Sequence, residues 1–262
     1  MKKLKILIVE GNLTSENKNF KDAGIQTHTE SLKESIANYN DNVNYEILNP
    51  SSEDNFNKII VKLESFDGLV WGGSSLNIYN DTPEIKRQIF FMKECFNKVK
   101  NILAICWGMQ VAVAAAGGEV KKAKEPNIGI TKEIIINENG LANPLYEGKD
   151  EKFNAPAFNF DEVVKLPKNT ICLASNKTNK IQSLYFKINK TKVWGLQYHP
   201  EITYEKMISL IEFRKQRLKE IRKAFKNNED IEKHILKIKS EILNSNKDKR
   251  MVELKNWLNQ IN

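Results

Sequence analysis

Cys106 stands where an apolar run of the sequence gives way to an alanine-rich one. The run 102–105 is typical of a buried strand, and 109–116, which ends at two glycines, is typical of a buried helix. Small residues at 104 and 108 complete the small-x-nucleophile-x-Gly spacing of a nucleophile elbow, a sharp turn that lifts one side chain clear of a sheet. A helix N-terminus favours a thiolate over a thiol. The spacing makes Cys106 a candidate nucleophile, with an inert core cysteine as the alternative.

A cysteine nucleophile needs a base, and the chain has three histidines. His199 directly follows the expected buried strand 192–197, and Glu201 lies two residues further on, within reach to orient the imidazole ring. His234 falls on a charged helical stretch, where a surface or packing role is expected, and His28 falls in the first turn of an expected helix, where it belongs to the capping region. The sequence therefore predicts a catalytic triad of Cys106, His199 and Glu201.

Two consecutive glycines, Gly72 and Gly73, follow another expected strand and provide candidate oxyanion donors. A glycine lets backbone N–H groups face a ligand closely, and such donors stabilise the charge of a tetrahedral intermediate. We expect the N–H of Gly73 to act together with that of Trp107, the residue after the nucleophile. A plain turn is the alternative for the glycine pair.

Strands and helices alternate in the first 118 residues, which predicts an α/β fold with a doubly wound, mostly parallel sheet. Because ligands bind beyond the carboxyl ends of such strands, Cys106 is expected at the functional edge of the sheet. The expected strands are Leu4–Val9, Val43–Leu48, Gly68–Trp71 and Ile102–Ile105, and the expected helices are Thr27–Tyr39, Asp54–Leu63, Pro83–Val99 and Met109–Ala116.

The pattern changes after Gly118 to short strands separated by turn signals, which predicts a small antiparallel section joined to the sheet. These strands are expected at Ile128–Ile136, Phe153–Phe158, Ile171–Ala174, Ile181–Ile188 and Lys192–Gln197. Helical periodicity then runs to the end of the sequence, in Tyr204–Phe225, Asp230–Leu243 and Asp248–Gln260. We therefore expect a domain of residues 1–205 and a basic helical extension of residues 206–262. The first extension helix is expected to pack on the sheet, whereas the later two could close the fold, form a dimer or dock a partner.

Composition excludes several classes of protein. The net charge is +8, and residues 205–262 hold 15 Lys and Arg against 9 Asp and Glu, but both signs are mixed in helical sequence, so nucleic-acid binding is not expected. Three cysteines without paired spacing suggest no disulfide framework and no zinc knuckle, which fits a cytoplasmic setting. The apolar start is interrupted by Lys5 and ended by Glu10, so neither a signal peptide nor a membrane span is expected. No cofactor or metal is expected either.

Several motifs in residues 4–205 together resemble the class I glutamine amidotransferase family, and within it the stand-alone domains similar to the glutaminase part of GMP synthase. They are Gly72-Gly73-Ser74-Ser75 with Tyr79, Asp81 and Pro83; Ala104-Ile105-Cys106-Trp107-Gly108-Met109-Gln110; Ile128-Gly129-Ile130; Asp161-Glu162-Val163 with Leu166-Pro167; and Gly195-Leu196-Gln197-Tyr198-His199-Pro200-Glu201.

The resemblance implies hydrolysis of the side-chain amide of glutamine through a γ-glutamyl thioester on Cys106, with release of ammonia. It places Gly73 in the oxyanion hole, and Gln110 and Gly72 at the substrate. Asn159 and Phe160 lie in the segment that corresponds to the family's glutamine-lining segment and are carried over as substrate-binding residues. That segment has no histidine here, and Ala104 stands where the family usually has glycine, so the identity of the substrate is left open.

Three functions are compatible with these residues. The leading hypothesis is a glutaminase that passes ammonia to an acceptor on a separate synthetase chain, because no ATP-pyrophosphatase segment or P-loop occurs in this sequence. The first alternative is a γ-glutamyl peptidase or amidase acting on a small metabolite. The second alternative is a non-catalytic regulatory binding protein, against which the complete triad argues. Homo-oligomers through the C-terminal helices are a further possibility.

Overall fold

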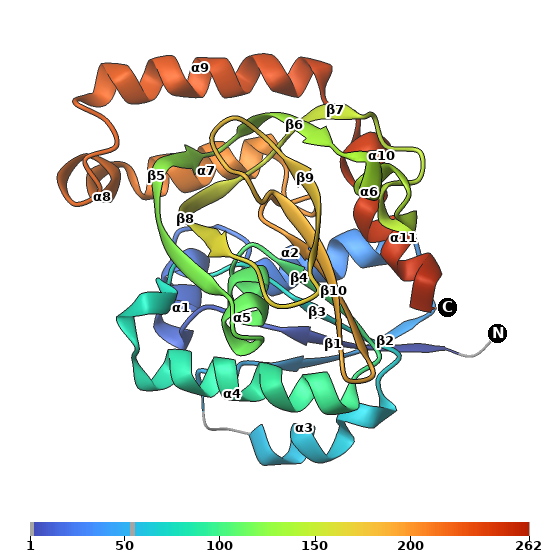
Figure 1. The fold of residues 1–262 in the computed structure, drawn as a ribbon. Coiled ribbons are helices and arrows are strands. Elements are labelled where there is room, and N and C mark those ends of the chain that lie inside the picture. The colour runs from blue at the N-terminus through green and yellow to red at the C-terminus, as the bar shows by residue number, and fades with distance from the viewer. Residues whose placement is uncertain (1–2, 53–55, 262) are drawn as a thin grey trace.

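Five parallel strands form the half of the main sheet that leads to Cys106 (Figure 1). The computed structural model describes residues 3–52 and 56–261. All neighbouring strands in this half are parallel, as the sequence predicted, and three of the four predicted strands match at both ends. In spatial order the strands are β2 (Val43–Leu48), β1 (Leu4–Val9), β3 (Gly68–Trp71), β4 (Asn101–Ile105) and β11 (Thr191–Leu196).

Helices cover both faces of the sheet, which confirms the predicted α/β class. Successive side chains of β1 point to opposite faces. Ile6 and Ile8 join a buried apolar cluster with α2 (His28–Ala37) and α11 (Val252–Ile261). Leu7 and Val9 join a second cluster with α3 (Phe56–Lys62), α4 (Pro83–Lys98) and α5 (Trp107–Ala115). Positions 54 and 55 of the predicted helix 54–63 lie outside the described residues.

The sheet continues beyond β11 as an antiparallel section, in the order β10 (Ser183–Ile188), β9 (Ile171–Ser175), β6 (Thr131–Ile136) and β7 (Lys152–Ala155). A separate antiparallel ribbon pairs β5 (Glu119–Ile128) with β8 (Phe158–Lys165). The antiparallel section was predicted, but the bounds of two of its strands were wrong. The expected strand 128–136 is broken at Gly129, whose φ of 81° is incompatible with a strand. The expected strand 153–158 is interrupted after Ala155, at Pro156.

The sequence patterns missed two strands, β5 and its partner β8, and two helices, α1 (Thr14–Asp22) and the four-residue α6 (Glu138–Leu141). Helix α1 buries only Phe20, so it carries almost no apolar periodicity. Strand β5 contains Pro126 and several charged residues, and its pairing with β8 shifts register between Lys122 and Asn127. An irregular, half-exposed strand of this kind does not produce the alternation that identifies a strand.

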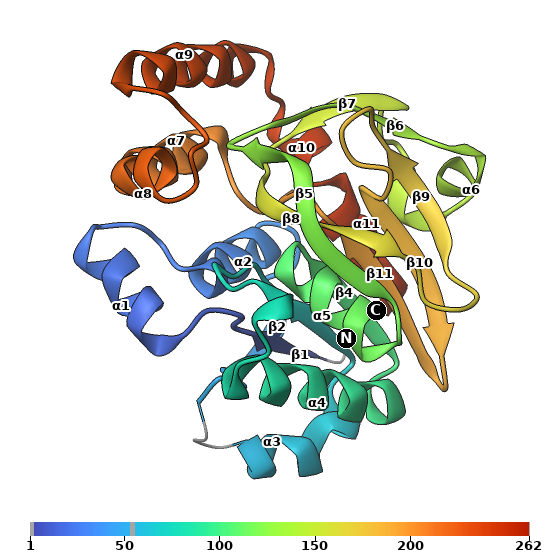
Figure 2. The same ribbon diagram turned by 60° about the vertical axis from the view of Figure 1, so that its left-hand side comes forward.

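The C-terminal part of the chain forms five helices rather than the three that were expected. They are α7 (Tyr204–Phe213), α8 (Lys215–Glu220), α9 (Asn228–Asn244), α10 (Lys247–Arg250) and α11 (Val252–Ile261). Figures 1 and 2 show α7, α8 and α9 together at the end of the molecule away from α3 and α4. Their apolar residues pack with one another and with Ile128 and Ile130, so the expectation that the first tail helix packs on the main sheet was wrong. Among the C-terminal helices, the one that packs on the main sheet is α11.

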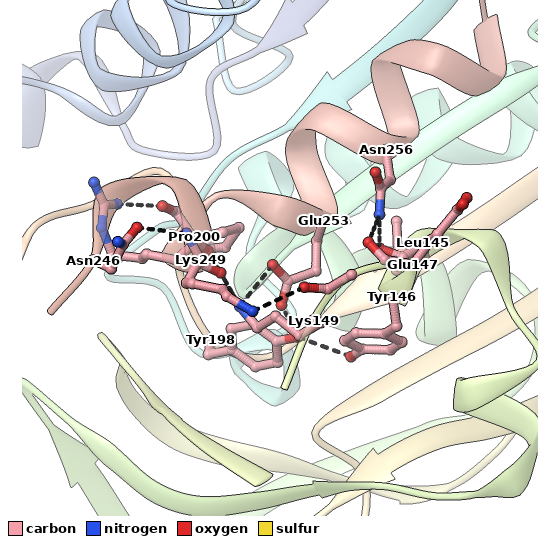
Figure 3. A network of polar contacts seen from close by, with 12 residues as sticks. Leu145, Tyr146, Glu147, Lys149, Tyr198, Pro200, Asn246, Lys249, Glu253 and Asn256 are labelled. Carbon is pink, nitrogen blue, oxygen red and sulfur yellow. Dashed lines mark hydrogen bonds and ion pairs between the residues drawn. The ribbon is translucent and has the colours of Figure 1, made fainter. Parts of the chain in front are cut away.

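A buried polar network ties α11 to the strand that leads to His199 (Figure 3). The Nζ of Lys149 lies 3.0 Å from the Oε2 of Glu253, with exposed side-chain fractions of 4% and 0%. The other carboxylate oxygen of Glu253 accepts a hydrogen bond of 2.7 Å from the hydroxyl of Tyr198, which is 2.8 Å from the hydroxyl of Tyr146. The last helix is therefore held by charge as well as by the apolar contact of its Trp257 with the sheet.

Within residues 3–52 and 56–261, every helix is either too short or too polar to cross a membrane. The boundary between a domain of residues 1–205 and an extension of residues 206–262 stays a prediction.

Candidate active site

Cys106 occupies a sharp turn between β4 and α5. Its backbone has φ of 53° and ψ of −102°, a conformation that costs energy for a residue with a side chain and that is typical of a functional turn. The N–H of Cys106 donates to the carbonyl of Leu196 over 2.6 Å, which anchors the turn to β11. A Cβ atom on Gly108 would lie 2.6 Å from the carbonyl oxygen of Trp71, so only glycine allows this approach of helix and strand. The predicted elbow is therefore present.

His199 and Glu201 lie beyond the end of the neighbouring strand β11, as expected. The Nδ1 of His199 is 2.8 Å from the Oε1 of Glu201, and the two residues are 2% and 4% exposed. The backbone N–H of His199 donates to the carbonyl of Pro156 over 2.8 Å, which fixes the position of the loop. A buried carboxylate on Nδ1 leaves the Nε2 atom of the ring available for a second partner.

The charges of this group favour a protonated imidazole. Burial by itself lowers the pKa of His199, but attraction to Glu201 and to the Cys106 thiolate, together with hydrogen bonds to both, raises it from 6.5 to about 10. His199 therefore carries a proton at neutral pH and can form an ion pair with a thiolate. Such a pair is the activated form of a cysteine nucleophile with its proton donor.

A second histidine lies against the first. The ring of His28 stacks on that of His199 with centroids 5.6 Å apart and an angle of 17° between the planes. Burial, and then the positive charge of His199, hold the pKa of His28 well below its usual value, so this ring is neutral. The predicted place of His28 in the first turn of a helix is confirmed, since Thr27 caps α2, but its contact with His199 was not foreseen. The Nε2 of His234 is bound to the carbonyl of Ile128, in agreement with a packing role.

The predicted oxyanion donors lie beside these residues. A Cβ atom on Gly73 would come within 2.9 Å of the His199 ring and within 2.7 Å of the His28 ring, so glycine is required there. Within the described parts of the chain, neither the Gly73 N–H nor the Trp107 N–H donates a hydrogen bond. Two free N–H groups at the start of a helix and at a glycine turn are suited to a developing negative charge. Their role as an oxyanion hole stays a prediction.

A pocket opens beside Cys106, and three predicted substrate residues line it: Gln110, Asn159 and Phe160. The side-chain amide of Gln110 donates to the Oε1 of Gln197 over 3.3 Å, and Gln197 in turn is 3.6 Å from the Cys106 Sγ. Gly72 is not among the pocket residues. Its carbonyl accepts the N–H of Gly108 over 3.2 Å, which serves the elbow, and its binding of substrate stays a prediction.

Sequence reasoning missed the charged residues of this pocket. Asp161 is buried, and its carboxylate accepts hydrogen bonds from Asn77 over 2.6 Å and from the Tyr79 hydroxyl over 2.9 Å. Burial raises the pKa of Asp161 above its usual value, although these hydrogen bonds and the charge of Arg222 act in the opposite direction. The remaining charged residues come from the C-terminal part of the chain and are Arg214, Arg217 and Arg222. Asp161 could have been identified from the sequence, because it belongs to the Asp161-Glu162-Val163 motif, but no sequence motif includes the three arginines.

A metal could be held by His28, His199 and Glu201, whose ligand atoms lie within 4.8 Å of one another. Imidazole binds a metal ion only in its neutral form. Because the raised pKa of about 10 favours the protonated ring of His199 and its Nδ1 is already bonded to Glu201, the His199–Glu201 pair fits proton transfer better than metal binding. The expectation of no metal or cofactor stays a prediction.

The arrangement of elbow, histidine and carboxylate can be compared with known proteins. The family model described as glutamine amidotransferase class-I matches residues 21–216. The chain belongs to this family. It is 31% identical over 207 residues to a gamma-glutamyl-L-1-hydroxyisopropylamide hydrolase from a Pseudomonas species, a match that covers 78% of this chain and 69% of the relative.

A second relative and one solved structure are also similar to this chain. A glutamine-hydrolyzing GMP synthase subunit from Sulfolobus acidocaldarius is 31% identical over 147 residues, which cover 56% of this chain and 73% of the relative. The crystal structure of a glutamine amidotransferase from Thermotoga maritima has the same fold, with a TM-score of 0.63 and 16% identity, over 100% of this chain and 99% of the other. Relatives of this family are named as hydrolases and glutamine-hydrolysing enzymes, so this chain is an enzyme of the same general type.

Proposed function

We propose that this chain is a cysteine hydrolase that cleaves the side-chain amide of γ-glutamyl compounds, with water as the final acceptor. The Cys106 thiolate attacks the γ-carbonyl carbon, and the N–H groups of Gly73 and Trp107 stabilise the oxyanion. His199 gives its proton to the departing amine as the C–N bond breaks, which leaves a γ-glutamyl thioester. Water then loses a proton to His199 and attacks the thioester, so glutamate leaves and the Cys106–His199 pair is restored.

One observation supports the proposal that water is the acceptor. The pocket beside Cys106 is lined by Arg214, Arg217, Leu218 and Arg222, which belong to the chain's own C-terminal part. We take the segment around α8 to close this side of the site against a separate acceptor chain. The name of the Pseudomonas relative, a hydrolase of a γ-glutamyl amide, supports the same choice.

A second candidate is a glutaminase that supplies ammonia to a separate synthetase chain, as the leading sequence hypothesis had it. The Sulfolobus acidocaldarius relative, which is named as one subunit of GMP synthase, favours this function. The complete set of Cys106, His199 and Glu201 argues against the third hypothesis, a non-catalytic regulatory protein. Association of the chain with itself through its C-terminal helices stays a prediction.

Substrate comparison separates the two enzymatic candidates. We expect the purified chain alone to release glutamate from γ-glutamyl alkylamides or γ-glutamyl peptides with a kcat/KM at least about tenfold above that for glutamine, because the ammonia that leaves glutamine is too small to fill the pocket beside α8. The measurement is glutamate formation with each substrate at matched concentrations. Equal or faster hydrolysis of glutamine, or activity that requires an added synthetase chain, would contradict the proposal.

The pH dependence follows from the raised pKa of His199. Because the folded value of about 10 lies above the ordinary 6.5, protonated His199 stabilises the fold fully below pH 6.5, and this contribution is lost as the pH rises through 10. The proton is also needed by the leaving amine, so kcat/KM is expected to fall above about pH 10. Glu201→Gln removes the largest favourable charge and should move this limb to lower pH. A pH–rate profile of both proteins tests this, and an unchanged alkaline limb in the variant would refute the role of Glu201.

A further inference from the structure

Three arginines from one short segment line the pocket that contains Cys106. Arg214 joins α7 to α8, Arg217 lies within α8, and Arg222 follows it. The segment lies outside the catalytic motifs of the sequence, and the triad does not use these side chains. Guanidinium groups gathered at a pocket are suited to carboxylate or phosphate, because each presents a planar fork of donors.

Two of the arginines have partners within the protein. The Nη2 of Arg214 is 2.9 Å from a carboxylate oxygen of Glu16, and its guanidinium lies over the ring of Phe158 at 5.3 Å. The Nη2 of Arg222 donates to the Oδ1 of Asn77 over 3.2 Å, and its guanidinium lies 4.5 Å from the centre of the Phe160 ring. These contacts fix both side chains against the wall of the pocket.

Arg217 is different. Its side chain is half-buried and, among the residues that the structure describes, forms no hydrogen bond or ion pair. Burial lowers the pKa of the Arg214 guanidinium, Glu16 raises it, and the like charges of Arg217 and Arg222 lower it again, so the three cations repel one another. A half-buried cation beside two others and without an acceptor is costly unless an anion joins it.

The charges in the pocket do not balance without an additional anion. Glu16 neutralises Arg214, and Asp161 offsets Arg222, whose charge acts on it. This leaves the charge of Arg217. A γ-glutamyl group carries one ammonium and one carboxylate, so it is neutral as a whole and adds nothing to the balance. A negative charge on the amine half of the substrate would complete this balance.

We infer that Arg217, supported by Arg222, binds a carboxylate on the leaving-amine half of the substrate, which makes γ-glutamyl amino acids the preferred substrate class. This inference rests on the proposed hydrolysis at Cys106. A γ-glutamyl amino acid bears two carboxylates and one ammonium, and its second carboxylate supplies the one negative charge that the pocket lacks. A guanidinium and a carboxylate in a partly buried pocket form a charge-assisted pair.

The test uses two substrates that differ in a single charge, γ-glutamylglycine and γ-glutamylglycinamide. We expect the native chain to hydrolyse the first with a kcat/KM at least about tenfold above that for the second. Arg217→Gln should lower the value for γ-glutamylglycine about tenfold or more and leave that for the glycinamide within about twofold. Lys219→Gln, a lysine of the same helix that does not line the pocket, is the control and should change neither.

Binding to the Cys106→Ala variant separates the inference from the proposed reaction. Calorimetry on this variant should show tighter binding of γ-glutamylglycine than of γ-glutamylglycinamide, and Arg217→Gln in the same background should abolish the difference. Hydrolysis without preference for the carboxylate would overturn the inference and leave the proposed function standing. Charge-dependent binding without any turnover by the native chain would overturn the proposed function and leave the carboxylate-binding role of Arg217 standing. Equal losses with both substrates in Arg217→Gln would mean that Arg217 binds the glutamyl half, and would also overturn the inference.

Discussion

Cys106→Ala is expected to lower kcat/KM for a γ-glutamyl amide by about ten thousand-fold or more, because no thioester can form without the thiolate. The fold should be retained, since the change removes one buried sulfur atom and keeps the Cβ atom of the strained turn at φ 53°. Glutamate release measures the activity, and the thermal midpoint of unfolding checks that the variant is folded.

The matched control is Cys172→Ala. Cys172 lies on β9 and does not line the pocket, and its Sγ donates hydrogen bonds to the carbonyl oxygens of Ala174 and Lys180, so activity should remain within about twofold of the native value. Substantial activity in a folded Cys106→Ala protein would contradict covalent catalysis at this residue. A comparable loss in Cys172→Ala would mean that the assay reports general damage to cysteine variants.

Glu253→Ala is expected to have the largest effect on stability, about 3–5 kcal/mol in the free energy of unfolding, because it leaves the Lys149 ammonium buried without its counter-charge. The hydroxyl of Tyr198 loses its acceptor at the same time. Since Tyr198 directly precedes His199, activity should also fall. Urea unfolding followed by circular dichroism gives the stability, and Figure 3 shows the contacts that would be lost.

Two controls make this result specific. Replacing both charges, with Lys149→Met and Glu253→Met together, should recover much of the loss, because the charge left without a partner is what destabilises the single variant. Glu229→Ala removes the partner of Lys233 in an exposed pair, with exposed side-chain fractions of 69% and 65%, and should change stability little. A Glu253→Ala protein as stable as the native chain would show that α11 is held by its apolar contacts alone.

The parts of the fold that local patterns control were predictable. Strands β1, β3 and β4 are short, largely apolar runs between helical periods, and the carboxyl ends of all strands in a parallel sheet lie at one edge. The same rule placed Cys106 and His199 together although 93 residues separate them in the sequence. Helix α1 and strand β5 were not predicted, because their polar sequences are stabilised by contacts with distant segments rather than by a periodic apolar face.

The charged wall of the pocket could not be predicted for a related reason. Arg214, Arg217 and Arg222 lie on a mixed-charge helical segment that resembles an ordinary solvated surface. Their position depends on how α7 and α9 pack on the broken stretch around Gly129, which is a tertiary contact. The stacking of His28 on His199 likewise joins the start of α2 to the end of β11. Neither arrangement can be predicted from the local spacing of apolar residues.

The most direct test of catalysis at Cys106 is the site of covalent labelling by an electrophilic analogue of glutamine, such as a chloroketone in place of the side-chain amide. Mass spectrometry after digestion should find one label per chain, on Cys106, with none on Cys95 or Cys172. An excess of γ-glutamyl substrate should prevent labelling, and His199→Ala should slow it strongly, because the thiolate loses its partner. Labelling at Cys172 or Cys95 instead, or labelling of Cys106 that neither substrate nor the loss of His199 affects, would contradict a Cys106–His199 nucleophile.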